Sequence, residues 1–179
     1  ILIKQARPLY IDDNDFRVDL DNMVYAFDST TIDLCLSLYP WAKFHHQKGA
    51  VKMHTLLDLR GSIPVFIDIT EGSVHDVNLL DVMPIEPGSY YIMDKGYIDF
   101  HRLYSLFHQA HAFFVMRAKD NLKYEVVSST EVDKDTGLIS DQIVKLTGYK
   151  SSRSYPDKFR LIIYEDYATN TVYPFMTND

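Results

Sequence analysis

The sequence predicts a mixed α/β sheet in which three sequential strands are followed by a helix, a strand, a second helix and a fifth strand. Two runs, Val24–Phe27 and Tyr90–Met93, are apolar at consecutive positions, as expected for strands buried on both faces. Between Asp99 and Ala110 the apolar residues recur instead at helical spacing. The alternation of these two patterns is typical of an α/β domain.

The first three strands are predicted to follow one another directly as a meander. The first begins at Met23 and continues to Leu36. Ala50–Leu59 and Ile63–Thr70 flank a short turn-forming link at 60–62, so we expect them to form an antiparallel pair.

Two helices and two strands follow. The spacing of apolar residues predicts a short helix over Asp76–Val82, which Pro84 stops. After the strand Tyr90–Met93, Asp99 is predicted to cap a second helix. The residues expected on the buried face of that helix are Phe100, Leu103, Phe107 and Ala110. Ala112–Met116 is the predicted fifth strand.

Composition divides the chain into three segments. Residues 1–22 are polar and acidic, and we interpret them as an N-terminal lead-in. Residues 23–118 are the predicted α/β core. Residues 119–179 are predicted to form a β-rich appendage, because strand-like runs alternate there with turn-rich segments. Those runs are Tyr124–Val127, Ile139–Lys145, Phe159–Tyr164 and Thr171–Met176.

The overall composition excludes several classes of protein. A chain of 179 residues with 46% hydrophobic and 24% charged residues is typical of a soluble globular domain. The single cysteine, Cys35, excludes an intramolecular disulfide and favours the cytoplasm. The apolar runs fall short of the roughly 18 residues of a membrane span, so no membrane partner is expected. The net charge of −7 argues against a broadly basic, nucleic-acid-binding surface.

The common nucleotide and zinc-protease motifs do not occur. The seven glycines are never spaced as a phosphate-binding loop or a dinucleotide fingerprint requires, and neither Gly-x-Ser-x-Gly nor His-Glu-x-x-His is found. ATPase, dinucleotide-dependent and zinc-protease functions therefore lose their main support.

Two aspartates stand where an apolar strand ends. Asp28 follows Val24–Phe27, and Asp94 follows Tyr90–Met93. A carboxylate in or beside a buried strand is costly unless it is paired or bound to a cation. Two carboxylates from neighbouring strands would suit Mg²⁺ or Mn²⁺. Alternatively each aspartate caps a turn or accepts backbone N–H bonds, and the spacing by itself leaves both interpretations open.

The sequence around both aspartates resembles one known family. Asp28-Ser29-Thr30 in the first strand and Asp94-Lys95-Gly96-Tyr97 after the fourth resemble the ribonuclease-H-like fold of DDE transposases. More closely, four blocks in order are similar to bacterial insertion-sequence transposases of the IS-four type. The blocks are Tyr25–Leu34, Lys48–His54, Gly72–Asp76 and Tyr91–Tyr97.

This resemblance implies the catalytic domain of a DNA transposase, which hydrolyses phosphodiester bonds and transfers strands at insertion-sequence ends. Asp28 and Asp94 would be the first and second catalytic aspartates. They would hold two Mg²⁺ or Mn²⁺ ions, which activate a water or a DNA 3′-hydroxyl for in-line attack. The implied partners are DNA, as transposon ends and target, and a second copy in a full-length homodimer. The implied location is the bacterial cytoplasm, at the nucleoid.

The third acidic residue departs from the family pattern. In this family a β-rich insertion, which residues 119–179 match, precedes a helix with a glutamate in a Tyr…Arg…Glu…Lys signature. No such helix precedes the end at Asp179, and the acids Glu165 and Asp166 do not match it. We therefore expect a C-terminally truncated ribonuclease-H-like domain that lacks the third acid and is inactive by itself.

A basic stretch is the best candidate for a DNA-facing surface. Residues 42–57 contain no acid. Their basic and imidazole side chains are Lys43, His45, His46, Lys48, Lys52 and His54. Lys52 and His54 alternate on one face of the predicted second strand, where they either contact phosphate or form the exposed face of an edge strand. We assign Lys48, Lys52 and His54 as DNA-binding candidates.

Residues beside the two aspartates are expected to support the site. Lys95 is a further DNA-binding candidate, through a phosphate contact. His75 and Asp76 either orient the site or simply begin the short helix, where an acid is favoured near the positive end. Tyr97 is expected to pack.

A weaker basic and aromatic patch occurs in the appendage, and a solvated loop is the favoured interpretation. Its members are Tyr149, Arg153, Tyr155, Lys158 and Arg160. Two functions other than transposition also stay open for the whole chain. One is a ribonuclease-H-like nuclease that hydrolyses without joining. The other is a decayed or co-opted domain that only binds DNA or a partner.

Overall fold

The computed structural model describes residues 5, 20–35, 43–45 and 48–179. These residues fall into two compact units that divide between Pro84 and Ile85. Most of the predicted lead-in at 1–22 lies outside the described residues. Among the helices of the described ranges, none has the length and apolarity needed to cross a bilayer.

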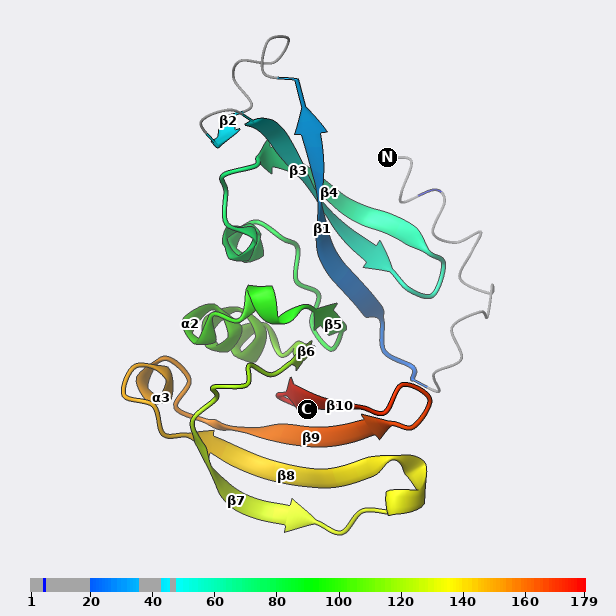
Figure 1. The fold of residues 1–179 in the computed structure, drawn as a ribbon, viewed down its shortest axis with the longest axis vertical. Helices are drawn as coiled ribbons and strands as arrows, with labels where there is room; N and C mark the ends of the chain where they lie inside the picture. The colour runs from blue at the N-terminus through cyan, green and yellow to red at the C-terminus, as the bar shows by residue number, and fades with distance from the viewer. Residues whose placement is uncertain (1–4, 6–19, 36–42, 46–47) are drawn as a thin grey trace. The chain divides into compact units, whose positions relative to one another are not determined.

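In the first unit three long strands pair antiparallel, with β3 in the middle (Figure 1). β3 (Lys48–Asp58) pairs with β1 (Val24–Leu34) on one side and with β4 (Ile63–Glu71) on the other. The short β2 (Lys43–His45) pairs with the start of β3. The predicted antiparallel pair on either side of the link 60–62 is confirmed.

Side chains of these strands alternate between two faces. On one face Phe27 of β1 lies opposite Leu56 of β3, and both are buried. The helix η1 (Asp76–Asp81) lies over this face, where it buries Leu79 and Leu80. The predicted helix is therefore present, although a six-residue segment adopts the tighter 3₁₀ geometry common in short pieces.

The strands of the second unit follow the order β5-β6-β10-β9-β8-β7. β5 (Tyr90–Met93) and β6 (Phe113–Arg117) are parallel, and every other described pair in this unit is antiparallel. The remaining strands are β7 (Tyr124–Thr130), β8 (Leu138–Leu146), β9 (Lys158–Asp166) and β10 (Thr171–Thr177). The predicted mixed α/β class is confirmed, and this arrangement is compatible with a ribonuclease-H-like fold.

Pairing of β10 with β6 joins the predicted appendage directly to the predicted core. The boundary between the two compact units lies between residues 84 and 85, whereas the predicted boundary between core and appendage lies between residues 118 and 119. The interpretation of 119–179 as an insertion therefore stays a prediction.

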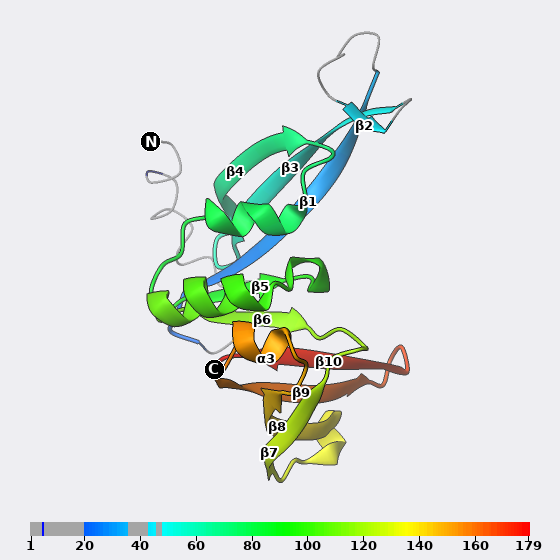
Figure 2. The ribbon, with the colours of Figure 1, turned by 90° about the vertical axis from the view of Figure 1, so that its left-hand side faces the viewer.

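Short helical segments connect the strands of the second unit. They are η2 (Lys95–Tyr97), α2 (Phe100–Arg102), η3 (Leu103–His108), η4 (Lys134–Thr136) and α3 (Ser151–Ser154). α2 and α3 contact each other and lie on the same side of this unit (Figures 1 and 2).

Asp99 caps the helix as predicted, because its Oδ1 accepts a hydrogen bond from Arg102 N at 3.1 Å. The expectation of regular α-helix is wrong from Leu103 onward, where η3 is a π-helix. Leu103 and Phe107 remain fully buried, since positions four apart stay on one face of the wider turn.

Tyr155 lies at the centre of an aromatic core in the second unit and is 1% exposed. Its ring makes edge-to-face contacts with Tyr104, Phe114 and Phe159 at centroid distances of 5.3, 6.3 and 5.7 Å. Burial raises the pKa of its phenol. Each such ring pair adds about 0.5–1.5 kcal/mol of stability beyond the effect of the area it buries. Because Phe114 belongs to β6 and Phe159 to β9, Tyr155 attaches the end of α3 to the sheet.

Candidate active site

Asp28 lies within β1, opposite Thr55 of β3. It is exposed, and its carboxylate makes no hydrogen bond to another described residue. The exposed carboxylate therefore does not carry the expected cost of burial. The alternative interpretation, in which Asp28 caps a turn, does not apply either. Because the residue is exposed, a cation or a substrate group can approach it.

Asp94 directly follows β5 and is also exposed. It caps η2, because Oδ1 accepts a hydrogen bond from Lys95 N at 2.5 Å. The capping interpretation is thus confirmed for this aspartate. Capping occupies one of the two carboxylate oxygens and orients the group, which leaves Oδ2 for another ligand.

The donor chemistry of these two residues fits a hard divalent ion. Mg²⁺ and Mn²⁺ prefer carboxylate oxygens and are commonly held by one or two carboxylates, with water and substrate as the other ligands. Within the described ranges no cluster of three His, Cys, Asp or Glu residues gathers around a metal-sized site. Because Asp28 and Asp94 belong to different units, their convergence on one site stays a prediction.

Lys52 and His54 of β3 contact Asp76 of η1 within the first unit. Lys52 Nζ donates a hydrogen bond to Val74 O at 2.8 Å and lies 3.1 Å from Asp76 Oδ1. The His54 side chain is 0% exposed, and its Nε2 hydrogen-bonds Thr70 Oγ1 at 2.9 Å. Its Nδ1 lies 4.0 Å from Asp76 Oδ1, too far for a hydrogen bond.

Burial lowers the pKa of His54, and the nearby Lys52 lowers it further, while Asp76 and Asp68 act in the opposite direction. A lowered pKa favours the neutral ring inside this cluster. Lys52, His54 and Asp76 thus form a cluster of one ammonium, one buried imidazole and one carboxylate.

These contacts correct two expectations about β3. The edge-strand interpretation is wrong, because β3 pairs on both sides. A direct DNA contact by His54 is also wrong, since a fully buried ring presents no surface to a phosphate. The register pairs Ser29 with His54, which places Lys52 and His54 on the face of the sheet opposite Asp28.

The remaining candidate residues lie at η1, in η2 and at the start of β3. His75 precedes η1 but makes no side-chain capping bond, and Asp76 contacts Lys52 instead of capping. Tyr97 is 2% exposed and packs, as expected. Lys48 begins β3, and its side chain lies outside the described part of the chain, as do the side chains of Lys43, His45 and His46.

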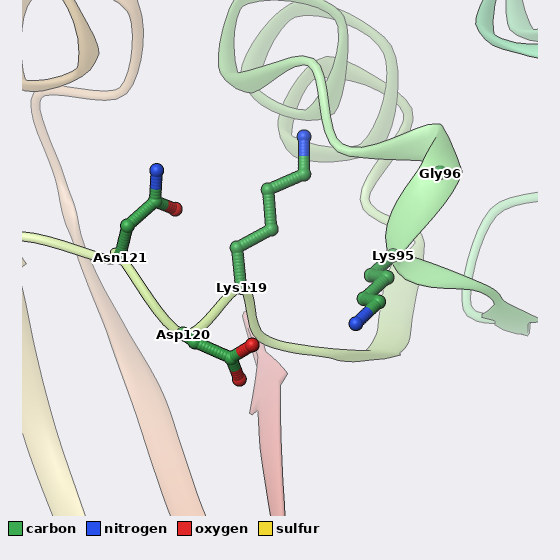
Figure 3. A pocket seen from close by; sticks show the side chains of 5 residues that line it. All are labelled: Lys95, Gly96, Lys119, Asp120 and Asn121. Atoms are coloured by element: carbon green, nitrogen blue, oxygen red, sulfur yellow. The ribbon is translucent and has the colours of Figure 1, made fainter.

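Lys95 is exposed and lines a pocket of about 430 Å³ beside Asp94 (Figure 3). Lys119, Asp120 and Asn121, in the loop after β6, complete the lining with Gly96. Sequence reasoning missed this loop. The available signal was its polar, turn-forming composition directly after a predicted buried strand.

The weak basic and aromatic patch of the appendage does not form one surface. Tyr155 is a core residue, and Arg160 forms a two-bond ion pair with Asp141 at 2.8 and 2.7 Å. Arg153 instead stacks on Tyr149, which is 73% exposed, with its guanidinium carbon 4.3 Å from the ring centroid.

Comparison with known proteins identifies the family. The model of the Transposase DDE domain matches residues 19–173, so the chain belongs to the DDE transposase family. The chain is 32% identical over 161 residues to putative transposase y4zB of Sinorhizobium fredii, a match covering 88% of this chain and 44% of the relative. It is 26% identical over 140 residues to a probable transposase for insertion sequence element IS5377 of Geobacillus stearothermophilus, covering 78% and 36%. The chain thus spans less than half the length of these relatives.

Proposed function

We propose that this chain forms part of the catalytic domain of an insertion-sequence transposase of the IS-four type. Its reaction would be metal-dependent hydrolysis of DNA phosphodiester bonds followed by strand transfer. The observation that best supports this is the exposure of Asp28 within β1 and of Asp94 directly after β5, both inside the segment that matches the family. The proposed partners are transposon ends, target DNA and a second copy of the protein. The proposed location is the cytoplasm.

In this proposal Asp28 and Asp94 hold two Mg²⁺ or Mn²⁺ ions. When bound, such ions activate a water or a 3′-hydroxyl and stabilise the leaving oxygen. The Lys95 N–H fixes one oxygen of Asp94, so the second oxygen is oriented before an ion arrives. Residues 23–118 would form the ribonuclease-H-like core and 119–179 its insertion. We further propose that the chain by itself does not cleave DNA, because neither Glu165 nor Asp166 matches the third acid of the family signature.

Metal binding by the isolated chain tests the role of the two aspartates. We expect the wild-type chain to reduce the electron paramagnetic resonance signal of free Mn²⁺ at millimolar concentration. Asp28→Asn and Asp94→Asn should each weaken binding by at least about tenfold, because each removes a carboxylate ligand. Asp33→Asn is the matched control, since Asp33 is an exposed aspartate of the same strand as Asp28. Unchanged Mn²⁺ binding in both test variants, or equal loss in the control, would contradict the proposal.

A further inference from the structure

The pocket beside Asp94 adjoins a second pocket of the same unit. The second pocket has a volume of about 210 Å³, and Lys119 and Asn121 line both. The wall of the second pocket also includes Lys123 from the end of the same loop, Gly148 from the turn before α3 and Ser151, the first residue of α3. We refer to these two adjoining pockets, whose lining residues lie between η2 and α3, together as the trough.

The charged side chains along this trough are mostly basic. Lys95, Lys119 and Lys123 line it, and Asp120 is the one acid among the described lining residues. All three lysines are exposed. Lysine ammonium groups along a concave surface are the usual partners of a phosphate backbone.

Asp120 does not neutralise the whole trough. Figure 3 shows the Lys119 side chain extending to the opposite side of the loop from Asp120. In the same view Lys95 points from η2 toward this loop. Lys119 lines both pockets, so its ammonium is available to a ligand in either one.

The far end of the trough offers groups suited to a nucleic-acid strand. Ser151 lines this end, although its hydroxyl donates a hydrogen bond to Gly148 O at 3.2 Å, and the residues Tyr149 and Arg153 on either side of it in sequence present a stacked ring and guanidinium. Gly96 at the near end has no heavy atom within 4 Å of the position a Cβ would take, so its backbone is open to a close approach.

We propose that this trough binds the sugar–phosphate backbone of the DNA beside the scissile phosphate, with Lys119 and Lys123 as phosphate contacts. The inference rests on the proposed transposase function and adds to it the path of the DNA away from Asp94. Because the contacts are to phosphate, the trough binds without reading base sequence. A chain with a net charge of −7 would bind DNA there because three lysines and one acid line the trough, a local excess of positive charge.

Charge reversal combined with salt titration tests the trough. A fluorescein-labelled 30-base-pair duplex of mixed sequence is titrated with the 179-residue chain in 25–200 mM KCl with EDTA, and binding is followed by anisotropy. Lys119→Glu and Lys123→Glu should each raise Kd by about tenfold at low salt and reduce the slope of log K against log salt by about one.

Lys134→Glu is the matched control. Lys134 is also exposed, but β7 (Tyr124–Thr130) separates it from Lys123 along the chain. Its variant should bind nearly as wild type. Lysine acylation mapped by mass spectrometry on the wild-type chain gives a second measurement without a substitution. Bound DNA should protect Lys119 and Lys123 and leave Lys134 reactive.

Each alternative result overturns the inference. Absence of binding at 25 mM KCl, equal weakening by all three variants, or unchanged reactivity of Lys119 and Lys123 would exclude the trough as the DNA path. Because EDTA removes divalent ions, none of these results would touch the proposed metal role of Asp28 and Asp94. Conversely, loss of the metal role would leave the DNA contacts measurable, so the two proposals fail separately.

Discussion

The buried ring of His54 faces the carboxylate of Asp76 across 4.0 Å between Nδ1 and Oδ1. No hydrogen bond closes this gap, and Nδ1 is without a hydrogen-bond partner in the described part of the chain. Lys52, 3.1 Å from the same carboxylate oxygen, supplies the positive charge that a protonated His54 would otherwise supply. Burial lowers the pKa of this ring, which favours its neutral form.

Acid should therefore destabilise the first unit through His54. Its pKa is lowered from 6.5 in the folded chain, so below about pH 6.5 the unfolded state binds the proton more readily. Stability should be lost as the pH falls from 6.5 toward the folded pKa, with a slope of at most about 1.4 kcal/mol per pH unit. Thermal unfolding between pH 7.5 and 5.5 measures this slope, which His54→Gln should reduce.

Asp76→Asn gives the complementary test of the same cluster. Asp76 raises the pKa of His54, so its removal should lower that pKa further. Stability should then continue to fall over a wider acid range than in the wild-type chain. Identical pH profiles in wild type, His54→Gln and Asp76→Asn would show that His54 does not couple to folding.

Tyr155 should be far more important for stability than the nearby Tyr149. Tyr155→Ala removes a buried ring with several aromatic neighbours and should cost about 3–5 kcal/mol in the free energy of unfolding. Tyr149→Ala removes an exposed ring whose main described contact is Arg153 and should cost less than about 1 kcal/mol. Urea unfolding followed by near-ultraviolet circular dichroism compares them, and similar costs would contradict the described core.

Substitution by alanine should destabilise the protein at one glycine and leave its stability unchanged at another. Gly137 has φ 86°, and a Cβ there would lie 2.7 Å from Glu165 O, so Gly137→Ala should cost more than about 1 kcal/mol. A Cβ on Gly96 would meet no heavy atom within 4 Å, so Gly96→Ala should leave the melting temperature nearly unchanged. Differential scanning calorimetry of both variants checks this contrast, and a destabilised Gly96→Ala chain would refute the open geometry beside Asp94.

The ion pair between Asp141 and Arg160 should stabilise the second unit mainly at neutral pH. The Arg160 hydrogen bonds lower the pKa of Asp141, so the stabilisation is present above its ordinary value of 3.8 and is lost as the pH falls through the folded pKa. Arg160 is 37% exposed, so screening limits the cost of Asp141→Asn to about 1 kcal/mol at pH 7.

Asp157→Asn is the control for this ion pair. Asp157 and its neighbour His108 are both about half exposed, with 3.7 Å between the closest charged atoms. Its loss should cost less than about 0.5 kcal/mol. The cost of Asp141→Asn should shrink as the pH approaches 3, and a constant cost across pH would argue that shape rather than charge explains it.

Local patterns were sufficient to predict most of the strands. The run Tyr90–Met93 is a strand with the predicted limits, because four apolar residues between turn-forming segments have few other stable states. The π geometry after Leu103 was not predictable, since a π turn and an α turn bury residues four apart equally well.

The sequence pointed to the two acids of the candidate site but not to their surroundings. Asp28 and Asp94 each follow an apolar run, although Asp28 lies within β1 rather than at its end, and their role as site acids stays a prediction. The burial of His54 depends on Asp76, Thr70 and the pairing of β3 on both sides, which alternation in one strand cannot reveal. The trough was equally hidden, because Lys119 and Ser151 come together only after β7 and β8 have paired.

The pairing of β6 with β10 has a consequence for how the protein is made. Phe114 N donates a hydrogen bond to Asn178 Oδ1 across 64 residues of chain, so β6 leaves the ribosome long before that partner exists. Until then one edge of β6, with the fully buried Phe114 and Met116, has no strand beside it. The antiparallel pairs β7–β8, β8–β9 and β9–β10 connect neighbours in sequence and can form first. We therefore expect closure of β10 onto β6 to be the slow, long-range step, and the nascent chain to be most prone to aggregation just before it.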